Sequence, residues 1–187
     1  HNGIIENYME IKEELKSSGY NFLSDTDTEV IAHLLDYYYK GDIIEAVKQV
    51  IRKIEGAYAL GIIHADYPDT LIAVKKDSPL IVGIGEGENF IASDIPAILK
   101  YTRQVYILES GEMAIIKKDS ISLMKTDGTP ISKEVFNVTW DIEAAEKGGY
   151  EHFMLKEIYE QPEAIKDTLL PRINSSGAIK LDSINIT

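Results

Sequence analysis

The spacing of apolar residues divides the chain into a helical part, a strand-rich part and a second helical part. Between Asn7 and Gly56 apolar residues recur every three or four positions, which is typical of amphipathic helices. Three helices are predicted there, over residues 8–18, from the Thr26 region to Tyr38, and over 42–54. A glycine follows each of them, as is common at helix ends.

Start signals precede all three predicted helices. Asn7 can cap the first helix, and Asp42 can cap the third, each with a glutamate three positions later. Thr26 and Glu29 have the spacing of a capping box before the second helix. The helical boundaries are therefore predicted from polar residues as well as from the apolar pattern.

Beyond Gly56 the pattern changes to short apolar runs separated by Pro, Gly, Asp and Asn, which is typical of strands. Turns at 66–69 and 126–129 suit hairpins of an antiparallel sheet. A short helix over 95–100, with Asp94 as its cap, interrupts the strands. The predicted strands cover residues 57–64, 70–75, 80–84, 89–92, 103–108, 113–116, 121–125 and 132–138.

Past Thr139 the strand pattern stops. The stretch 141–149 is acidic and ends in two glycines, which is typical of a hinge or linker, and residues 150–169 have a helical pattern broken or kinked at Pro162. The pattern therefore predicts an α+β fold with one domain over residues 1–140, and a remaining part over residues 141–187 that begins with a hinge or linker.

Composition narrows the class of protein. The chain has 187 residues, 44% of them hydrophobic, as in ordinary globular proteins. A net charge of −12 argues against nucleic acid or an anionic membrane as a partner. No apolar stretch is long enough to span a membrane, and no signal-peptide pattern is present. The absence of cysteine excludes disulfides and cysteine nucleophiles within these residues and fits a cytoplasmic origin.

Three residues near the start carry candidate chemistry. Asn2 offers an amide donor, Gly3 offers an unobstructed backbone N–H, and Asp27 offers a carboxylate at a predicted helix start. Two donors and one anion can hold a small zwitterion, and a donor that stabilises an oxyanion is worth about 3 kcal/mol. Each also has a plain structural interpretation, because Asn-Gly is an ordinary turn dipeptide and Asp27 suits the first turn of a helix. No nucleophile accompanies them.

Other motifs have structural interpretations. The four histidines have no metal-ligand spacing, so neither a metal nor another cofactor is predicted. The glycine-rich run 83–87 matches no phosphate loop and is interpreted as a hairpin turn. Ser78 and Ser93 are interpreted as loop and cap residues.

Six motifs along nearly the whole chain carry more information together than singly. They are His1-Asn2-Gly3-Ile4-Ile5-Glu6-Asn7, Ser24-Asp25-Thr26-Asp27-Thr28-Glu29-Val30-Ile31-Ala32-His33-Leu34, Gly56-Ala57-Tyr58, Ser78-Pro79-Leu80, Glu88-Asn89-Phe90-Ile91-Ala92-Ser93-Asp94 and Lys156-Glu157-Ile158-Tyr159-Glu160-Gln161-Pro162. In order and spacing these motifs resemble the glutamine–fructose-6-phosphate aminotransferases. The Asn-Gly and Asp-Thr-Glu motifs are shared with other class II glutamine amidotransferases, whereas the motif at 156–162 is specific to the aminotransferases.

The resemblance implies an N-terminal nucleophile hydrolase fold, an αββα sandwich of two antiparallel sheets. It implies that Asn2 and Gly3 form the oxyanion hole and that Asp27 holds the amino group of glutamine. The implied substrates are L-glutamine and fructose 6-phosphate, and the implied products are glutamate and glucosamine 6-phosphate. A homodimer is implied for the full enzyme.

Two parts of the family pattern are not found in these residues. The family's nucleophile is an amino-terminal cysteine upstream of the Asn-Gly pair, with an Arg-Trp-x-Thr-His-Gly motif, and its sugar isomerase domains follow the linker. We therefore expect a glutaminase-domain piece, truncated at its N-terminus and inactive alone. The alternatives are another class II amidotransferase, such as one acting on phosphoribosyl pyrophosphate, or a non-catalytic scaffold or interaction module.

Overall fold

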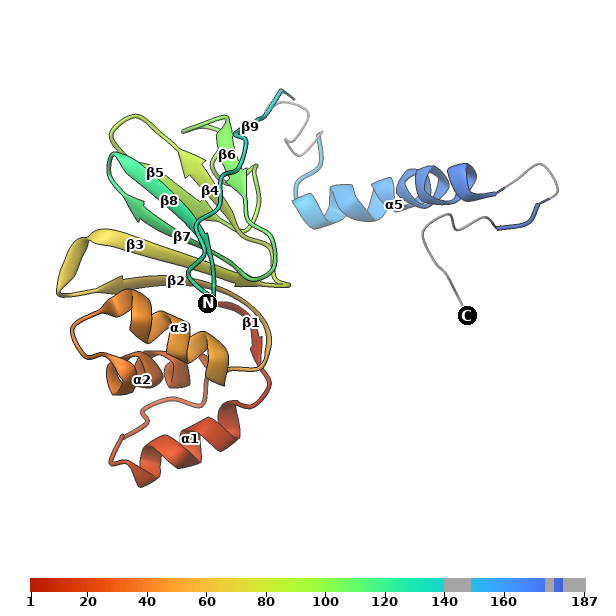
Figure 1. The fold of residues 1–187 in the computed structure, drawn as a ribbon. Helices are drawn as coiled ribbons and strands as arrows, with labels where there is room; N and C mark the ends of the chain where they lie inside the picture. Colours follow the sequence, from red (N-terminus) through yellow and green to blue (C-terminus); the bar gives the residue numbers. More distant parts are fainter. Residues whose placement is uncertain (140–148, 174–176, 180–187) are drawn as a thin grey trace. The chain divides into compact units, whose positions relative to one another are not determined.

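The computed structural model describes residues 1–139, 149–173 and 177–179, and the chain divides into two compact units, His1–Thr139 and Trp140–Thr187. The first unit contains three helices and nine strands (Figure 1). Its elements are β1 (Asn2–Ile5), α1 (Tyr8–Ser17), α2 (Thr28–Tyr38), α3 (Ile43–Lys53), β2 (Gly56–His64), β3 (Tyr67–Lys76), β4 (Ile81–Ile84), β5 (Asn89–Ala92), β6 (Gln104–Ile107), β7 (Glu112–Lys117), β8 (Ser120–Lys125) and β9 (Phe136–Asn137).

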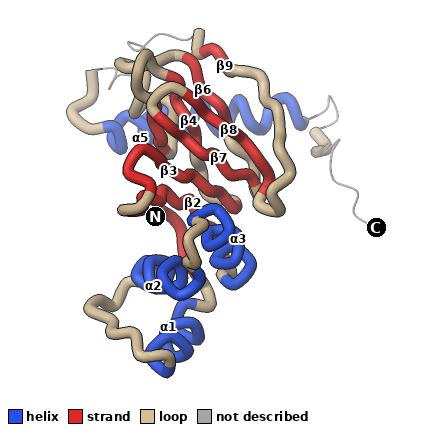
Figure 2. The backbone as a smooth tube through the Cα atoms, turned by 60° about the vertical axis from the view of Figure 1, so that its left-hand side comes forward, coloured by secondary structure: helices blue, strands red, loops and turns tan. Residues whose placement is uncertain are grey.

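The nine strands form two antiparallel sheets. One has five strands in the order β1-β2-β3-β7-β8, and the other has four in the order β5-β4-β6-β9. The helices lie against the five-stranded sheet, and the four-stranded sheet lies on its other side (Figures 1 and 2). This confirms the predicted α+β class with two antiparallel sheets.

The five-stranded sheet is buried on both faces. Because side chains alternate along a strand, one face carries large residues toward the helices, and the other face, toward the second sheet, carries small residues at its centre and larger ones such as Ile116 and Leu123 elsewhere. The large face packs on the buried stripes of the helices, which include Ile11, Val30 and Val47. Its own buried side chains are Tyr58, Leu60, Ile62, Ile72, Val74 and Met113.

The small face brings the two sheets close together. Ala59, Ala73 and Ala114 contribute to a second core cluster with residues of the four-stranded sheet, among them Val82. A Cβ atom added at Gly61 would lie 2.6 Å from the Cδ1 atom of Ile91, so a larger residue there would have to displace the end of that side chain. Residues with little or no side chain thus allow the sheets to approach closely at these positions.

The start of α3 forms as predicted. Asp42 precedes the helix, and its carboxylate accepts hydrogen bonds from the backbone N–H groups of Ile44 and Glu45. The start of α1 has the predicted position but not the predicted bond. The side chain of Asn7 makes no capping bond and instead pairs with Lys53 O and Glu55 N, which joins α1 to the chain entering β2.

Three local predictions are wrong. No helix forms over 95–100, where the chain makes successive turns, although Asp94 does accept a bond from the backbone N–H of Ala97. The predicted strand 132–138 is reduced to β9. The turn predicted at 66–69 is tighter, because Tyr67 already pairs with His64, and Pro68 lies within β3. Proline is tolerated there because pairing of β3 with β7 begins only at Leu71.

The second unit is described over residues 149–173 and 177–179. It contains α5 (Phe153–Leu169) and a 3-10 turn, η1 (Leu170–Arg172), and α5 continues through Pro162 rather than breaking there. Most of the predicted hinge at 141–149 lies outside the described residues. No helix in the described ranges is long and apolar enough to cross a membrane.

The close packing of the sheets generates a stability prediction. Ala114 is fully buried between the sheets, so Ala114→Leu has to displace neighbouring groups and is expected to lower the free energy of unfolding by about 1–3 kcal/mol. Chemical denaturation measures this change. Ser122→Leu, at an exposed position of β8, is the control and should change stability much less. Equal effects of the two substitutions would contradict the packing argument.

Candidate functional site

Asn2 and Gly3 lie in strand β1, at the edge of the five-stranded sheet. Asn2 is opposite Ala59 and Gly3 is opposite Tyr58, so the interpretation of Asn-Gly as a turn dipeptide is wrong. A strand holds both residues by backbone pairing with β2. The two candidate donors are thus placed on a regular element rather than on a loop.

Gly3 has a backbone conformation and an environment that exclude other residues. Its φ of +102° lies in the region that favours glycine. A Cβ atom at this position would lie 2.0 Å from the carbonyl oxygen of Ala57 and 2.8 Å from Ser78 Oγ. The backbone of Gly3 is therefore closely approached by β2 and by the segment that leads into β4.

The side chain of Asn2 is held by the second sheet. Its Nδ2 atom donates a hydrogen bond to Ser93 Oγ at 2.7 Å, and Ser93 directly follows β5. Both residues line a pocket of about 170 Å³ that also includes His1, Gly61 and Ile91. The pocket lies where β1 and β2 meet the end of β5, which gives a small molecule access to the Asn2 amide.

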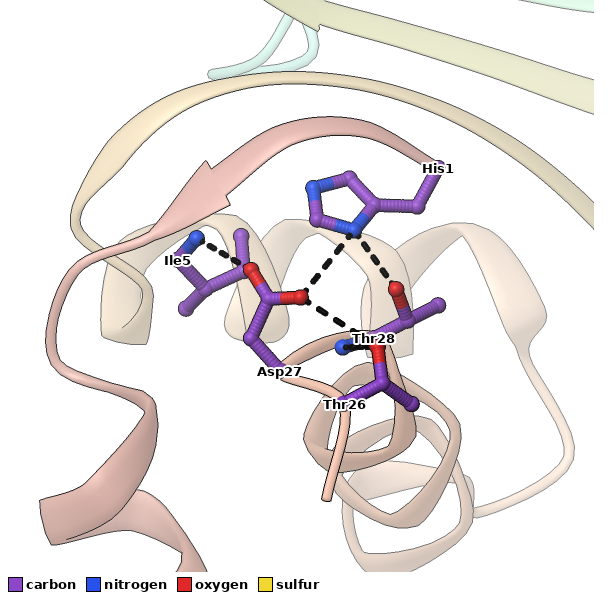
Figure 3. A network of polar contacts seen from close by, with 5 residues as sticks. All are labelled: His1, Ile5, Thr26, Asp27 and Thr28. Carbon is purple, nitrogen blue, oxygen red and sulfur yellow. Dashed lines mark hydrogen bonds and ion pairs between the residues drawn. The ribbon is translucent and has the colours of Figure 1, made fainter. Parts of the chain in front are cut away.

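Asp27 lies immediately before α2 and is bonded to β1 (Figure 3). Its Oδ2 atom accepts the backbone N–H of Ile5 at 2.8 Å. Its Oδ1 atom lies 3.4 Å from the hydroxyl of Thr26 and 3.9 Å from Nδ1 of His1. Because a carboxylate has about four acceptor positions, Oδ1 retains capacity for a further donor.

His1 connects the two halves of the candidate site. It adjoins Asn2 in β1, and its ring points toward the start of α2, where Nδ1 is 2.8 Å from Thr28 Oγ1 (Figure 3). Its side chain is only 4% exposed. Contacts of His1 and Ile5 with Asp27 and Thr28 therefore bring the strand that holds Asn2 and Gly3 next to the N-terminus of α2.

The capping box predicted for Thr26 and Glu29 does not form. The carboxylate of Glu29 instead accepts the backbone N–H groups of Leu23 and Ser24, at 2.7 and 2.8 Å, and the hydroxyl of Ser24. These bonds, of which the Ser24 hydroxyl is the largest cause, lower the pKa of Glu29 to about 2. Glu29 thereby fixes the extended segment that leads to Asp27.

Sequence reasoning missed His1, Ser78 and Ser93 as parts of this region. Their only signal was membership of the motifs that carried the resemblance, since neither serine shows a local pattern that links it to β1. Within the described ranges, no group of three or more acidic or histidine side chains is placed to hold a metal ion. The glycine run 83–87 covers the end of β4 and the turn that leads into β5, so the predicted hairpin is present.

Comparison with known proteins identifies related sequences. Residues 1–100 match the model of the glutamine amidotransferase domain. The whole chain is 64% identical to a glutamine–fructose-6-phosphate aminotransferase (isomerizing) of Caldanaerobacter subterraneus and 57% identical to one of Clostridium tetani. A protein of the same name from Aquifex aeolicus is 56% identical over 96% of this chain, and the match covers 30% of that protein's length. The chain spans about 31% of the length of the first two relatives.

Solved structures show the same fold. The glutamine phosphoribosylpyrophosphate amidotransferase of B. subtilis aligns with a TM-score of 0.59 and 25% identity, over 67% of this chain and 28% of that one. An allosteric regulatory enzyme of purine biosynthesis aligns with a TM-score of 0.58 and 24% identity, over 67% of this chain and 27% of that one. The likeness supports an N-terminal nucleophile hydrolase type of sandwich.

The environment of Gly3 predicts a loss of stability on substitution. Gly3→Ala places a methyl group against Ala57 O and strains the backbone, so we expect the free energy of unfolding to fall by about 2 kcal/mol or more. Gly111→Ala is the matched control, because Gly111 also has a positive φ but has nothing within 4 Å of an added Cβ. Its cost should be about 1 kcal/mol. Chemical denaturation measures both changes. Equal losses in the free energy of unfolding for the two variants would show that the contact with Ala57 is unimportant.

The bonds of Glu29 predict a pH dependence. Because its folded pKa is lowered from 4.5 to about 2, its contribution to stability is present above pH 4.5 and is lost as the pH falls toward 2. The difference in Tm between the wild type and Glu29→Gln should therefore shrink over that range. Glu10→Gln, on the exposed face of α1, is the control. A difference that is independent of pH would contradict this role.

Proposed function

Because the chain belongs to the glutamine amidotransferase domain family, we propose that it supplies the glutaminase part of a glutamine–fructose-6-phosphate aminotransferase. The observation that carries this proposal is the match along all 187 residues to relatives of that name. Residues 1–140 would be the C-terminal part of the glutaminase domain, and residues 141–187 would be the linker toward sugar isomerase domains. We further propose that the full enzyme is cytoplasmic, forms a homodimer and uses no cofactor.

Asn2 and Gly3 are assigned to the oxyanion hole. When a nucleophile attacks the side-chain amide of L-glutamine, negative charge develops on the carbonyl oxygen. The Asn2 amide and the backbone N–H of Gly3 would stabilise that charge, and donors that are positioned in advance require no reorganisation during the reaction. The placement of both residues on one paired strand supports this assignment.

Asp27 is assigned to the amino group of glutamine. Its Oδ2 atom is already bonded to Ile5, so Oδ1 is the atom available for a substrate ammonium. The position before α2 places this carboxylate at the positive end of the helix dipole, where a negative charge interacts favourably. The carboxylate would bind the substrate equally in the ground state and the transition state, and so would affect KM more than turnover.

The chemistry needs a nucleophile from outside these residues, since the chain contains no cysteine. In the proposed reaction a cysteine thiolate attacks the amide carbon, and the tetrahedral intermediate expels the nitrogen, which takes up a proton and leaves as ammonia. Water then hydrolyses the thioester to release glutamate, while ammonia passes to fructose 6-phosphate. The 187-residue chain alone is expected to be inactive.

A second candidate function is that of a glutamine phosphoribosylpyrophosphate amidotransferase, which the structural likeness favours. The much higher identity to the aminotransferases argues against it. A non-catalytic scaffold is the alternative outside enzymes. The two enzyme classes differ in the acceptor of ammonia. Identifying the molecule that receives the nitrogen therefore distinguishes them.

The test uses a chimaera in which this chain replaces the matching residues of the Caldanaerobacter subterraneus relative. We expect glutamate release, and transfer of nitrogen to fructose 6-phosphate rather than to phosphoribosyl pyrophosphate. Asn2→Ala should lower kcat about a hundredfold, and Asp27→Ala should chiefly raise KM for glutamine. The exposed Ser122→Ala is the control.

Two outcomes would contradict the proposal. Unchanged kinetics in both Asn2→Ala and Asp27→Ala would remove these residues from the site and favour a scaffold. Glutamate release by the 187-residue chain alone would mean that it contains a different nucleophile.

A further inference from the structure

The amide of Asn2 is oriented by a residue from the other sheet. Asn2 belongs to β1 of the five-stranded sheet, whereas Ser93 follows β5 of the four-stranded sheet, and the two lie 91 positions apart in the chain. The distance of 2.7 Å from Nδ2 to Oγ is within the range of a well-formed N–H···O bond. The bond therefore crosses between the two sheets at the pocket that Asn2 lines.

The β4–β5 hairpin places this serine. Ile81 of β4 is paired with Ala92 of β5, so the residues that precede β4 and follow β5 lie at the same end of the hairpin. Ser78, which precedes β4, lies close to Gly3, and Ser93, which follows β5, is bonded to Asn2. One end of the hairpin thus contacts both members of the Asn-Gly pair.

The amide nitrogen of asparagine carries two hydrogens in a fixed planar arrangement. One of them is donated to Ser93, so the other is held in a fixed direction and remains available to a ligand. Without this bond, the terminal torsion of asparagine has a broad energy minimum and the amide can turn. Ser93 therefore restricts the one torsion that aims the donor.

We infer that Ser93 is a positioning residue for the oxyanion hole, acting through the Asn2 amide. This inference rests on the proposed function, because it requires Asn2 to donate to the oxyanion. The role assigned to Ser93 is to orient the amide, and this role does not require Ser93 to contact the substrate. Removing its hydroxyl should reduce transition-state stabilisation by leaving the donor in place but poorly aimed.

The test is a double-mutant cycle in the chimaera. Ser93→Ala should lower kcat about tenfold and change KM for glutamine less than about twofold, since one hydrogen bond is lost and the amino-group site is intact. Asn2→Ala should lower kcat about a hundredfold. The double variant should be no slower than Asn2→Ala, because Ser93 has nothing left to position.

Two further variants exclude a general structural effect. Ser93→Thr retains the hydroxyl and should restore most of the activity, and Ser122→Ala should have none of these effects. The bond is also measurable in the 187-residue chain itself. In a ¹⁵N-labelled sample, Ser93→Ala should shift the side-chain amide resonances of Asn2, and Ser122→Ala should not.

The outcomes separate the inference from the proposed function. If Asn2→Ala leaves kcat unchanged, the oxyanion role of Asn2 is wrong and the inference falls with it. If Asn2→Ala lowers kcat but the effects of the two substitutions multiply in the double variant, the proposed function stands and the positioning role is overturned. Unmoved Asn2 resonances in Ser93→Ala would likewise overturn it.

Discussion

The hydrogen bond from Ile5 N to Asp27 Oδ2 joins the two structural elements on which the candidate site depends. Strand β1 is short and pairs with β2 over four residues, at the edge of its sheet. A carboxylate at the start of α2 ties that edge strand to the helical layer, so β1 is fixed on two sides. Because the same carboxylate is proposed to bind substrate, one group both builds the site and acts in it.

Strained backbone lies next to the candidate donors. Asp77 has a φ of +63°, and the bond from Ser78 N to Lys76 O closes a three-residue turn of a rare type. Ser110 holds this turn, since its hydroxyl donates to Asp77 Oδ1 and accepts the backbone N–H of Asp77. Such conformations persist where surrounding contacts determine them. Here the turn at Asp77 places Ser78 next to the backbone of Gly3.

Local patterns predicted the parts of the fold that local interactions decide. The start of α3 was predicted because Asp42 bonds to the adjacent residues Ile44 and Glu45. The prediction of a capping box was wrong because the carboxylate of Glu29 accepts the backbone N–H groups of Leu23 and Ser24, in the segment before α2. The strand position of Asn-Gly was not predictable from the dipeptide, since it depends on pairing with β2.

The chemistry of Asn2, Gly3 and Asp27 made them candidates and the resemblance gave them roles, whereas the partners that orient them came only from the structure. No spacing in the sequence connects Asn2 with Ser93, or Gly3 with Ser78, because these contacts arise from the stacking of two sheets. Sequence periodicity reports which face of a strand is buried. It does not report which strand of the other sheet lies opposite.

Small residues form part of the layer between the two sheets, and this has a consequence for protein engineering. Ala59 and Gly61 belong to this layer and also line the pocket beside Asn2. Filling the layer with larger side chains, a common route to thermostable variants, would move the hairpin that carries Ser93 away from β1. Selection for stability at these positions would therefore act directly on the geometry of the site, and the two properties could not be optimised independently.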